Sequence, residues 1–317
     1  MNKNYSFKSC LGEIDILFDV DERFSSIKTL LENVPRSKAT VQTNLRIIIQ
    51  YAQERKVYLS DDRYTLTIQG DTIDHLDNPF NLVGILQAII RFTGLHSTQH
   101  GIVLLHGSAA VYEGKAICFG DDGLSNAKTL SSLEIALCSH RYIGDEFLFL
   151  DTISKKIHGC PYNPLHIRDI VKEHLESVHN YQLLFTGFTP SQAGNFINPS
   201  KLFTIDDGKK LHAFIFVYFQ KPDSSPKVYK LTRSESYIAV KNMVAAHIIK
   251  LLYPQFDRMQ FTEQRDVSDQ IDYGKDLVNK VIGDMKAEEH IEKIAAIPCY
   301  RFYITDPCEI PVLCKQL

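Results

Sequence analysis

Residues 104–151 carry the pattern that most constrains the fold of this chain. The sequence there reads LLHGSAAVYEGKAICFGDDGLSNAKTLSSLEIALCSHRYIGDEFLFLD. Its apolar runs, its turn rich in glycine and aspartate and its helical stretch predict two strands, a turn, a helix and a further strand, in that order. Lysine and threonine open the helix, and an acidic pair lies within the last strand. This order is typical of proteins that hold a nucleoside triphosphate and its metal ion.

The turn before the helix departs from a Walker A loop. A Walker A loop places glycines so that backbone N–H groups surround phosphate oxygens, while its lysine neutralises charge and its Ser or Thr binds Mg²⁺. Here two extra residues separate the opening Gly-Asp-x-Gly from the closing Lys-Thr, and alanine replaces the glycine before the lysine. Read alone, the segment also fits a plain polar turn with a solvated lysine. The residues that we expect to bind nucleotide are Gly120, Asp121, Gly123, Ser125, Asn126, Ala127, Lys128 and Thr129.

An acidic pair, Asp145 and Glu146, follows sixteen residues after Thr129. This spacing is expected if the helix crosses back to a neighbouring parallel strand, and both acids would then lie near the phosphates. Because adjacent side chains of a strand point to opposite faces, both reach one site only where the strand ends or bends. The alternative is an acidic pair on the surface ahead of an apolar strand.

These features together resemble the C-terminal kinase domain of the HPr kinase/phosphorylase family, whose fold is related to that of phosphoenolpyruvate carboxykinase. The family carries a His-Gly before the first strand, a G-D-S-G-x-G-K-S loop and an H-R-L-x-A-D-D segment. This chain has LHG at 105–107, GDDGLSNAKT at 120–129 and HRYIGDE at 140–146. Weaker similarity extends through CPY at 160–162 and the strand at 211–219. The chain lacks the family's E-V-R-G-L-G signature for work on HPr, so HPr is not the expected substrate.

The resemblance implies a role for each residue of the motif. Lys128 contacts the β- and γ-phosphates of ATP and Thr129 binds Mg²⁺, with Asp145 as the candidate carboxylate ligand of that ion. One member of the acidic pair, Asp145 or Glu146, binds the metal and the other accepts the proton of the attacking hydroxyl; the sequence does not assign the two roles. His106 matches a family histidine near the transferred phosphate, although a lone histidine after an apolar run is also typical of a hydrogen-bonded structural residue.

We therefore expect an α/β protein in which an HPr kinase C-terminal-like P-loop domain, residues 99–317, follows a smaller N-terminal α/β lobe, residues 1–98. The expected activity is ATP-dependent transfer of the γ-phosphoryl group to a hydroxyl of a peptide or protein serine, or of a small molecule. Because the turn is poor in glycine, the alternative is a nucleotide-binding protein without transfer activity that engages a partner. A structural interaction protein without a ligand site is a third reading. The related family forms rings, which leaves a homo-oligomer open.

Composition and charge argue against several other classes. The formal net charge of −3, without a basic run, disfavours nucleic acid as a partner. No stretch approaches the roughly 18 apolar residues of a membrane span, and the first residues lack the apolar centre of a signal peptide. Seven scattered cysteines without a Cys-x-x-Cys pair favour the cytoplasm. Histidine pairs such as His174 and His179 have no Cys or Asp at a metal-site spacing, so the sequence gives no support for a zinc site.

The remaining elements follow from hydrophobic periodicity and turn residues. Strands are predicted at 5–20, 45–51, 57–59, 64–68, 211–219 and 300–304, and a loop at 220–227. Helices are predicted at 23–31, at 79–92 with Asn78 as its cap, and at 167–178, 234–252 and 276–296.

Overall fold

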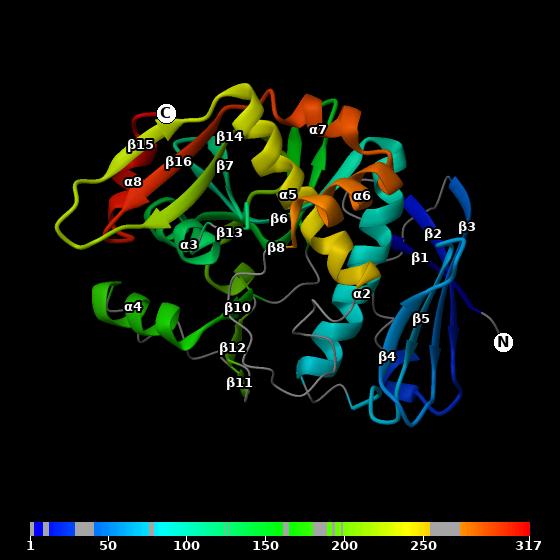
Figure 1. The fold of residues 1–317 in the computed structure, drawn as a ribbon. Helices are drawn as coiled ribbons and strands as arrows, with labels where there is room; N and C mark the ends of the chain where they lie inside the picture. Colours follow the sequence, from blue (N-terminus) through cyan, green and yellow to red (C-terminus); the bar gives the residue numbers. More distant parts are fainter. Residues whose placement is uncertain are drawn as a thin grey trace.

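The structure is a computed structural model that describes residues 3–8, 13–28, 41–75, 79–123, 125, 127–160, 165–179, 189–191, 194–197, 199–253 and 273–317. An eight-stranded mixed sheet forms the centre of the molecule (Figure 1). Its main path has the order β13-β8-β6-β7-β14-β16-β15, and β9 pairs with β8 and β14 off that path. The strands are β6 (Ile102–Tyr112), β7 (Lys115–Gly120), β8 (Arg141–Asp151), β9 (Lys156–Gly159), β13 (Thr204–Ile205), β14 (Lys209–Phe219), β15 (Lys227–Lys230) and β16 (Cys299–Ile304).

Helices cover both faces of this sheet, which explains why β6 reads as a nearly continuous apolar run. Alternate residues of each strand point to opposite faces. On one face Val103, Leu105 and Phe214 share a core with α2 (Pro79–Ser97), α5 (Arg233–Leu252), α6 (Lys275–Met285) and α7 (Glu288–Ile294). On the other face Ile117 and Phe119 share a core with α3 (Lys128–Ser139), α4 (Asp169–His179) and α8 (Glu309–Cys314). The predicted α/β class is confirmed at this level.

The expected crossing from β7 through α3 to a neighbouring strand is wrong in one respect. β8 pairs antiparallel with β6, and β6 pairs antiparallel with β7, so β7 and β8 run parallel with β6 between them. The reason is local. A two-residue turn with positive φ at Glu113 (48°) and Gly114 (80°) closes a tight β6–β7 hairpin, which gives β6 the place beside β7.

A second sheet stands on the other side of α2 (Figure 1, blue). It has the order β1-β2-β3-β5-β4, and its core residues, such as Ile47 and Ile49, belong to the same apolar cluster as Ile85 of α2 and Val103 of β6. The single strand expected at 5–20 is wrong, because β1 and β2 are separate strands that pair antiparallel. The strands are β1 (Lys3–Lys8), β2 (Glu13–Val20), β3 (Val41–Gln50), β4 (Lys56–Leu59) and β5 (Thr65–Gln69).

Smaller elements complete the described part of the chain. The helix predicted over 276–296 is wrong as one element, because a left-handed residue, Lys286 (φ 53°), ends α6 before α7 begins. Among the described helices, none combines the length and the apolar character that crossing a bilayer requires. Asn78, predicted as a helix cap, Asn126, predicted to bind nucleotide, and residues 161–162 of the family resemblance lie outside the described residues. The other short elements are β10 (Leu165–Ile167), β11 (Thr189–Ser191), β12 (Gly194–Ile197), η1 (Thr98–His100) and η2 (Pro199–Lys201).

Candidate functional site

The start of α3 and the middle of β8 meet at a cluster of charged side chains. The Lys128 ammonium donates to a carboxylate oxygen of Glu146. One residue along, the Thr129 hydroxyl donates to Oδ1 of Asp145 over 2.9 Å. The structure therefore brings together the four residues that the sequence singled out at the helix start and in the acidic pair.

Both acids reach this cluster because β8 is bent. Ala109 and Ala110 of β6 lie opposite Gly144 and Tyr142, so Ile143 is an extra residue in β8 and forms a bulge. Glu146 has a left-handed backbone with φ of 63°, which is rare for a non-glycine residue within a strand. Strand geometry requires β8 to bend if both acids are to reach one site, and the bulge and the left-handed Glu146 provide this bend. Strained backbone conformations of this kind are found mostly at functional sites, where the surrounding contacts stabilise them.

His106 lies between two carboxylates. Its Nε2 is 3.1 Å from Oε1 of Glu146, and its Nδ1 is 3.3 Å from Oδ2 of Asp121. The ring is buried, and that burial lowers the pKa of His106 despite the nearby Glu146 charge. His106 is therefore a buried part of the charged cluster, with each ring nitrogen beside a carboxylate.

Two ammonium groups face Glu146. In addition to Lys128, Lys250 of α5 places its Nζ 3.6 Å from Oε1 of Glu146. Burial works against ionisation of Glu146, but His106, Lys128 and Lys250 together hold its pKa well below the ordinary value. Burial also works against charge at Lys128, yet the carboxylates of Glu146 and Asp145 outweigh it and raise the pKa of the ammonium. For Asp145, burial raises the pKa. The two acids are thus electrostatically different, with Glu146 held more firmly as an anion.

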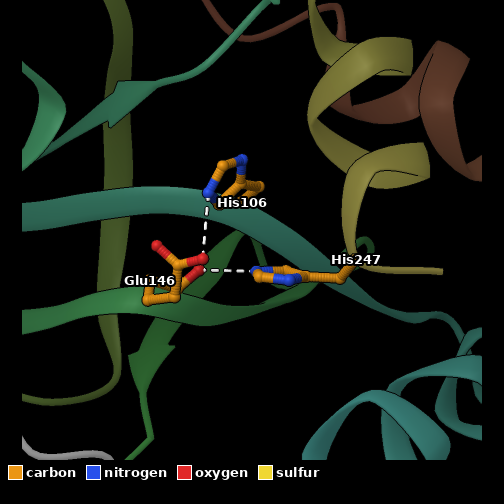
Figure 2. Close-up of side chains that lie close together, drawn as sticks. All are labelled: His106, Glu146 and His247. Carbon is orange, nitrogen blue, oxygen red and sulfur yellow. Dashed lines mark hydrogen bonds and ion pairs between the residues drawn. The ribbon is translucent and has the colours of Figure 1, made fainter. Parts of the chain in front are cut away.

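His247 of α5 is a site residue that the sequence analysis missed. Its Nε2 lies 2.7 Å from the backbone oxygen of Glu146, so the ring N–H donates to that carbonyl (Figure 2). The ring stacks on Phe147, with centroids 4.3 Å apart, and meets His106 edge-on. Burial lowers its pKa well below 6.5. No local signal marks this histidine, which sits in an apolar stretch of helix a hundred residues from the motif.

His106, Glu146 and His247 could also hold a metal ion. Each offers one ligand atom, and these atoms lie within 4.8 Å of one another. In addition, Nδ1 of His247 is buried without a hydrogen-bond partner. Two imidazoles and a carboxylate suit several divalent metals, so the donor set does not choose among them.

Residues 120–123 and 125 of the turn before α3 are linked by hydrogen bonds among themselves. Backbone N–H groups of this turn donate inward: Gly123 to Oδ1 of Asp121 over 2.9 Å, and Ser125 to Oδ1 of Asp122 over 2.9 Å. The Ser125 hydroxyl donates to the Gly120 carbonyl over 2.9 Å. A side chain at Gly120 has no room, because its Cβ would lie 2.5 Å from Sδ of Met243.

Two residues from distant elements fasten this turn. The hydroxyl of Tyr218 in β14 donates to the buried Asp122 carboxylate, and the Asn242 amide in α5 donates to the Asp122 carbonyl over 2.9 Å. These anchors are not predictable from local sequence, because both lie more than ninety residues along the chain from Asp122. Gly120, Asp121, Gly123 and Ser125, which the sequence predicted to bind nucleotide, therefore lie in a segment where the N–H groups of Gly123 and Ser125 are already occupied.

Ala127 forms the boundary between the turn and α3. It has left-handed angles (φ 63°, ψ 24°), the conformation that glycine adopts without strain. As the N-cap residue it has no side-chain oxygen, so no side chain at that position caps the first amides of α3. An uncapped helix start of this kind favours an anion.

Comparison of the sequence with protein-family models found no matching family, and a search of curated proteins found no match.

Proposed function

We propose that this protein is an ATP-dependent kinase with an HPr kinase-like nucleotide-binding fold, which transfers the γ-phosphoryl group to the hydroxyl of a serine or of a small molecule. The observation that carries the proposal is the convergence of Lys128, Thr129, Asp145 and Glu146 at the start of α3. A lysine, a hydroxyl and two carboxylates at an uncapped helix start are the groups that phosphoryl transfer uses for positioning and charge neutralisation.

Lys128 and the first turn of α3 are the phosphate-binding groups in this proposal. The helix start favours negative charge through its partial positive charge and its backbone N–H groups. Lys128 keeps its proton at neutral pH, because the neighbouring carboxylates raise its pKa against the effect of burial. A triphosphate would compete with Glu146 for this ammonium group.

Thr129 and Asp145 fit Mg²⁺ as the metal. They offer a hydroxyl and a carboxylate oxygen that already lie 2.9 Å apart, and Mg²⁺ prefers oxygen ligands and commonly keeps several waters. When bound, Mg²⁺ would neutralise charge on the phosphate oxygens. Asp145 is accordingly the metal-binding acid of the pair, and Glu146 is left for the acceptor.

Glu146, supported by His106, is the proton acceptor in this proposal. The acceptor oxygen bonds to the γ-phosphorus while the bond from phosphorus to the β,γ-bridging oxygen breaks. The hydroxyl proton passes to Glu146, and ADP leaves with the bonding electron pair. Lys128 holds the Glu146 pKa low in the free protein. When Lys128 binds phosphate instead, it stabilises the Glu146 anion less, the pKa of Glu146 rises and Glu146 becomes a better base.

The test uses the full chain with ATP and Mg²⁺ and measures nucleotide binding by calorimetry and phosphate transfer to a panel of serine peptides and small alcohols. Lys128→Ala should weaken ATP binding at least tenfold and abolish transfer. The double variant Asp145→Asn, Glu146→Gln should abolish transfer as well. Lys115→Ala is the matched control, because Lys115 is an exposed lysine at the start of β7. Unchanged transfer in either site variant would exclude this function.

A nucleotide-binding protein without transfer activity is the second candidate. The turn before α3 favours it, because the N–H groups of Gly123 and Ser125 are occupied by side chains of the turn itself. Such a turn must open before its amides can contact phosphate. Tight ATP binding without transfer to any acceptor would support this candidate over the kinase, and absence of ATP binding would exclude both.

A further inference from the structure

A second polar cluster lies among α3, α4 and the start of α8. Glu134 of α3 is almost fully buried, with 1% of its surface exposed. Nε2 of His174 in α4 lies 3.0 Å from its Oε1. Cys308, the N-cap residue of α8, completes the group. One ligand atom from each of the three lies within 4.8 Å of the others.

We propose that Glu134, His174 and Cys308 form a zinc site. Carboxylate oxygen, imidazole nitrogen and thiolate sulfur are the three ligand types that zinc takes in proteins. Zinc bonds of about 2.0 to 2.3 Å in a tetrahedron separate ligand atoms by roughly 3.5 Å. The Glu134 and His174 ligand atoms, now 3.0 Å apart, would therefore move slightly apart to admit the ion, and all three ligand atoms already lie within 4.8 Å of one another. A water molecule would fill the fourth position.

The charges of the cluster fit this assignment. A zinc ion carries two positive charges, and a carboxylate with a thiolate carries two negative ones, so the bound site is neutral where burial penalises net charge. Without metal, the thiol stays protonated, because burial, Asp306 and Glu134 raise the pKa of Cys308 to about 12. Zinc binding displaces that proton, as it does from other cysteine ligands.

The site would fasten α4 to the rest of the molecule. This helix contributes Leu175 to the core beside α3, but its Ile170 and Val178 side chains are exposed. His174 and Leu175 are adjacent, so the metal bond and the apolar contact would hold the same turn. The spacing of residues along the chain does not indicate a zinc site at His174, because its partners are forty and more residues away.

The experiment uses the full chain, stripped of metal with a chelator and then titrated with Zn²⁺ or Co²⁺. We expect at least one zinc ion per chain and, with cobalt, the charge-transfer absorption of a thiolate–cobalt bond. His174→Ala should weaken zinc binding at least about tenfold. Cys308→Ser should remove the charge-transfer band, and Cys314→Ala, a buried thiol on the same helix, should keep it. Lys128→Ala should leave the thiolate–cobalt band unchanged, so the result is independent of the kinase proposal.

The cobalt spectrum also separates this site from the cluster of His106, Glu146 and His247, which contains no sulfur. A wild-type protein without a thiolate–cobalt band would overturn the proposal, whatever its variants do. A band that survives Cys308→Ser and disappears in Cys138→Ser would also overturn it, because the ligand set would be wrong.

Discussion

At Ala127 a single methyl group stands where the backbone favours glycine. A residue with a Cβ is strained by about 1 to 2 kcal/mol in the left-handed conformation. Replacing it with glycine removes this strain, but glycine also gives the unfolded chain more conformational freedom, which offsets part of the gain. Ala127→Gly should therefore raise the free energy of unfolding by about 0.5 to 1 kcal/mol. Ala127→Val should lower it, because a β-branched side chain is worse at φ of 63°. Urea titrations compare the two, and equal shifts would contradict the assignment of strain.

His247 makes the stability depend on pH. Burial lowers its pKa well below 6.5. On acidification, His247 therefore becomes protonated in the unfolded chain at a higher pH than in the folded chain. Stability is then fully present above the unfolded pKa and falls as the pH falls, by up to about 1.4 kcal/mol per pH unit. His106 acts in the same direction.

His247→Gln removes the titrating group while its amide can still donate to the Glu146 carbonyl. Between about pH 7.5 and about pH 5.5, the variant should lose less stability than the wild type. Urea titrations at both pH values measure the difference. Parallel pH dependence of the two proteins would show that His247 titrates normally.

At the scale of elements, the sequence predicted the motif well and its surroundings poorly. The helix at Lys128 and the strand at Asp145 were predicted because their periodicity and turn residues are local. The break at Lys286 was not, since a left-handed lysine carries no glycine or proline signal. His247 and Tyr218 were missed because tertiary folding alone brings α5 and β14 to the site. The position of β6 between β7 and β8 likewise depends on long-range pairing.

The contact between β8 and β9 sets the bend that carries the acidic pair. A Cβ at Gly159 would lie 2.0 Å from the backbone oxygen of Ile143, the bulged residue of β8. Gly159→Ala should therefore cost about 3 kcal/mol, because a backbone atom must move. It should also weaken ATP binding, since β8 shifts two residues before Asp145.

Gly114→Ala is the control for this change. Gly114 has φ of 80° and no atom within 4 Å of its Cβ position, so only backbone strain of about 1 kcal/mol is expected. Urea titration gives both costs. Equal costs for the two variants would mean that the β8–β9 contact can relax freely.

At the scale of the whole molecule, the two sheets share one core. Ile85 of α2 packs in the same apolar cluster as Ile47 of the N-terminal sheet and Val103 of the central one. An ion pair of 2.8 Å between Arg63 and Asp284 adds a polar link from the N-terminal sheet to α6. The two sheets should therefore unfold together, because unfolding either sheet would expose apolar residues of α2 that pack against the other.

The chain has no tryptophan, so one exposed tyrosine replaced by tryptophan gives a fluorescent probe of one sheet. Tyr58→Trp reports on β4 and Tyr229→Trp on β15, and both positions are partly exposed. The two probes should give the same urea midpoint, and Ile85→Ala should lower both by the same amount, with a cost of about 2 to 5 kcal/mol. Separate midpoints would mean that the sheets unfold independently.

Nucleotide binding extends this test from cooperativity to function. If ATP with Mg²⁺ binds at Lys128, a concentration a hundredfold above its dissociation constant stabilises the folded state by about 2.7 kcal/mol. Because the core is shared, the Tyr58→Trp probe should report that gain in full, although β4 lies in the other sheet. Lys128→Ala should abolish the shift at both probes. A shift at Tyr229→Trp alone would confine the stabilisation to the central sheet and contradict a shared unfolding unit.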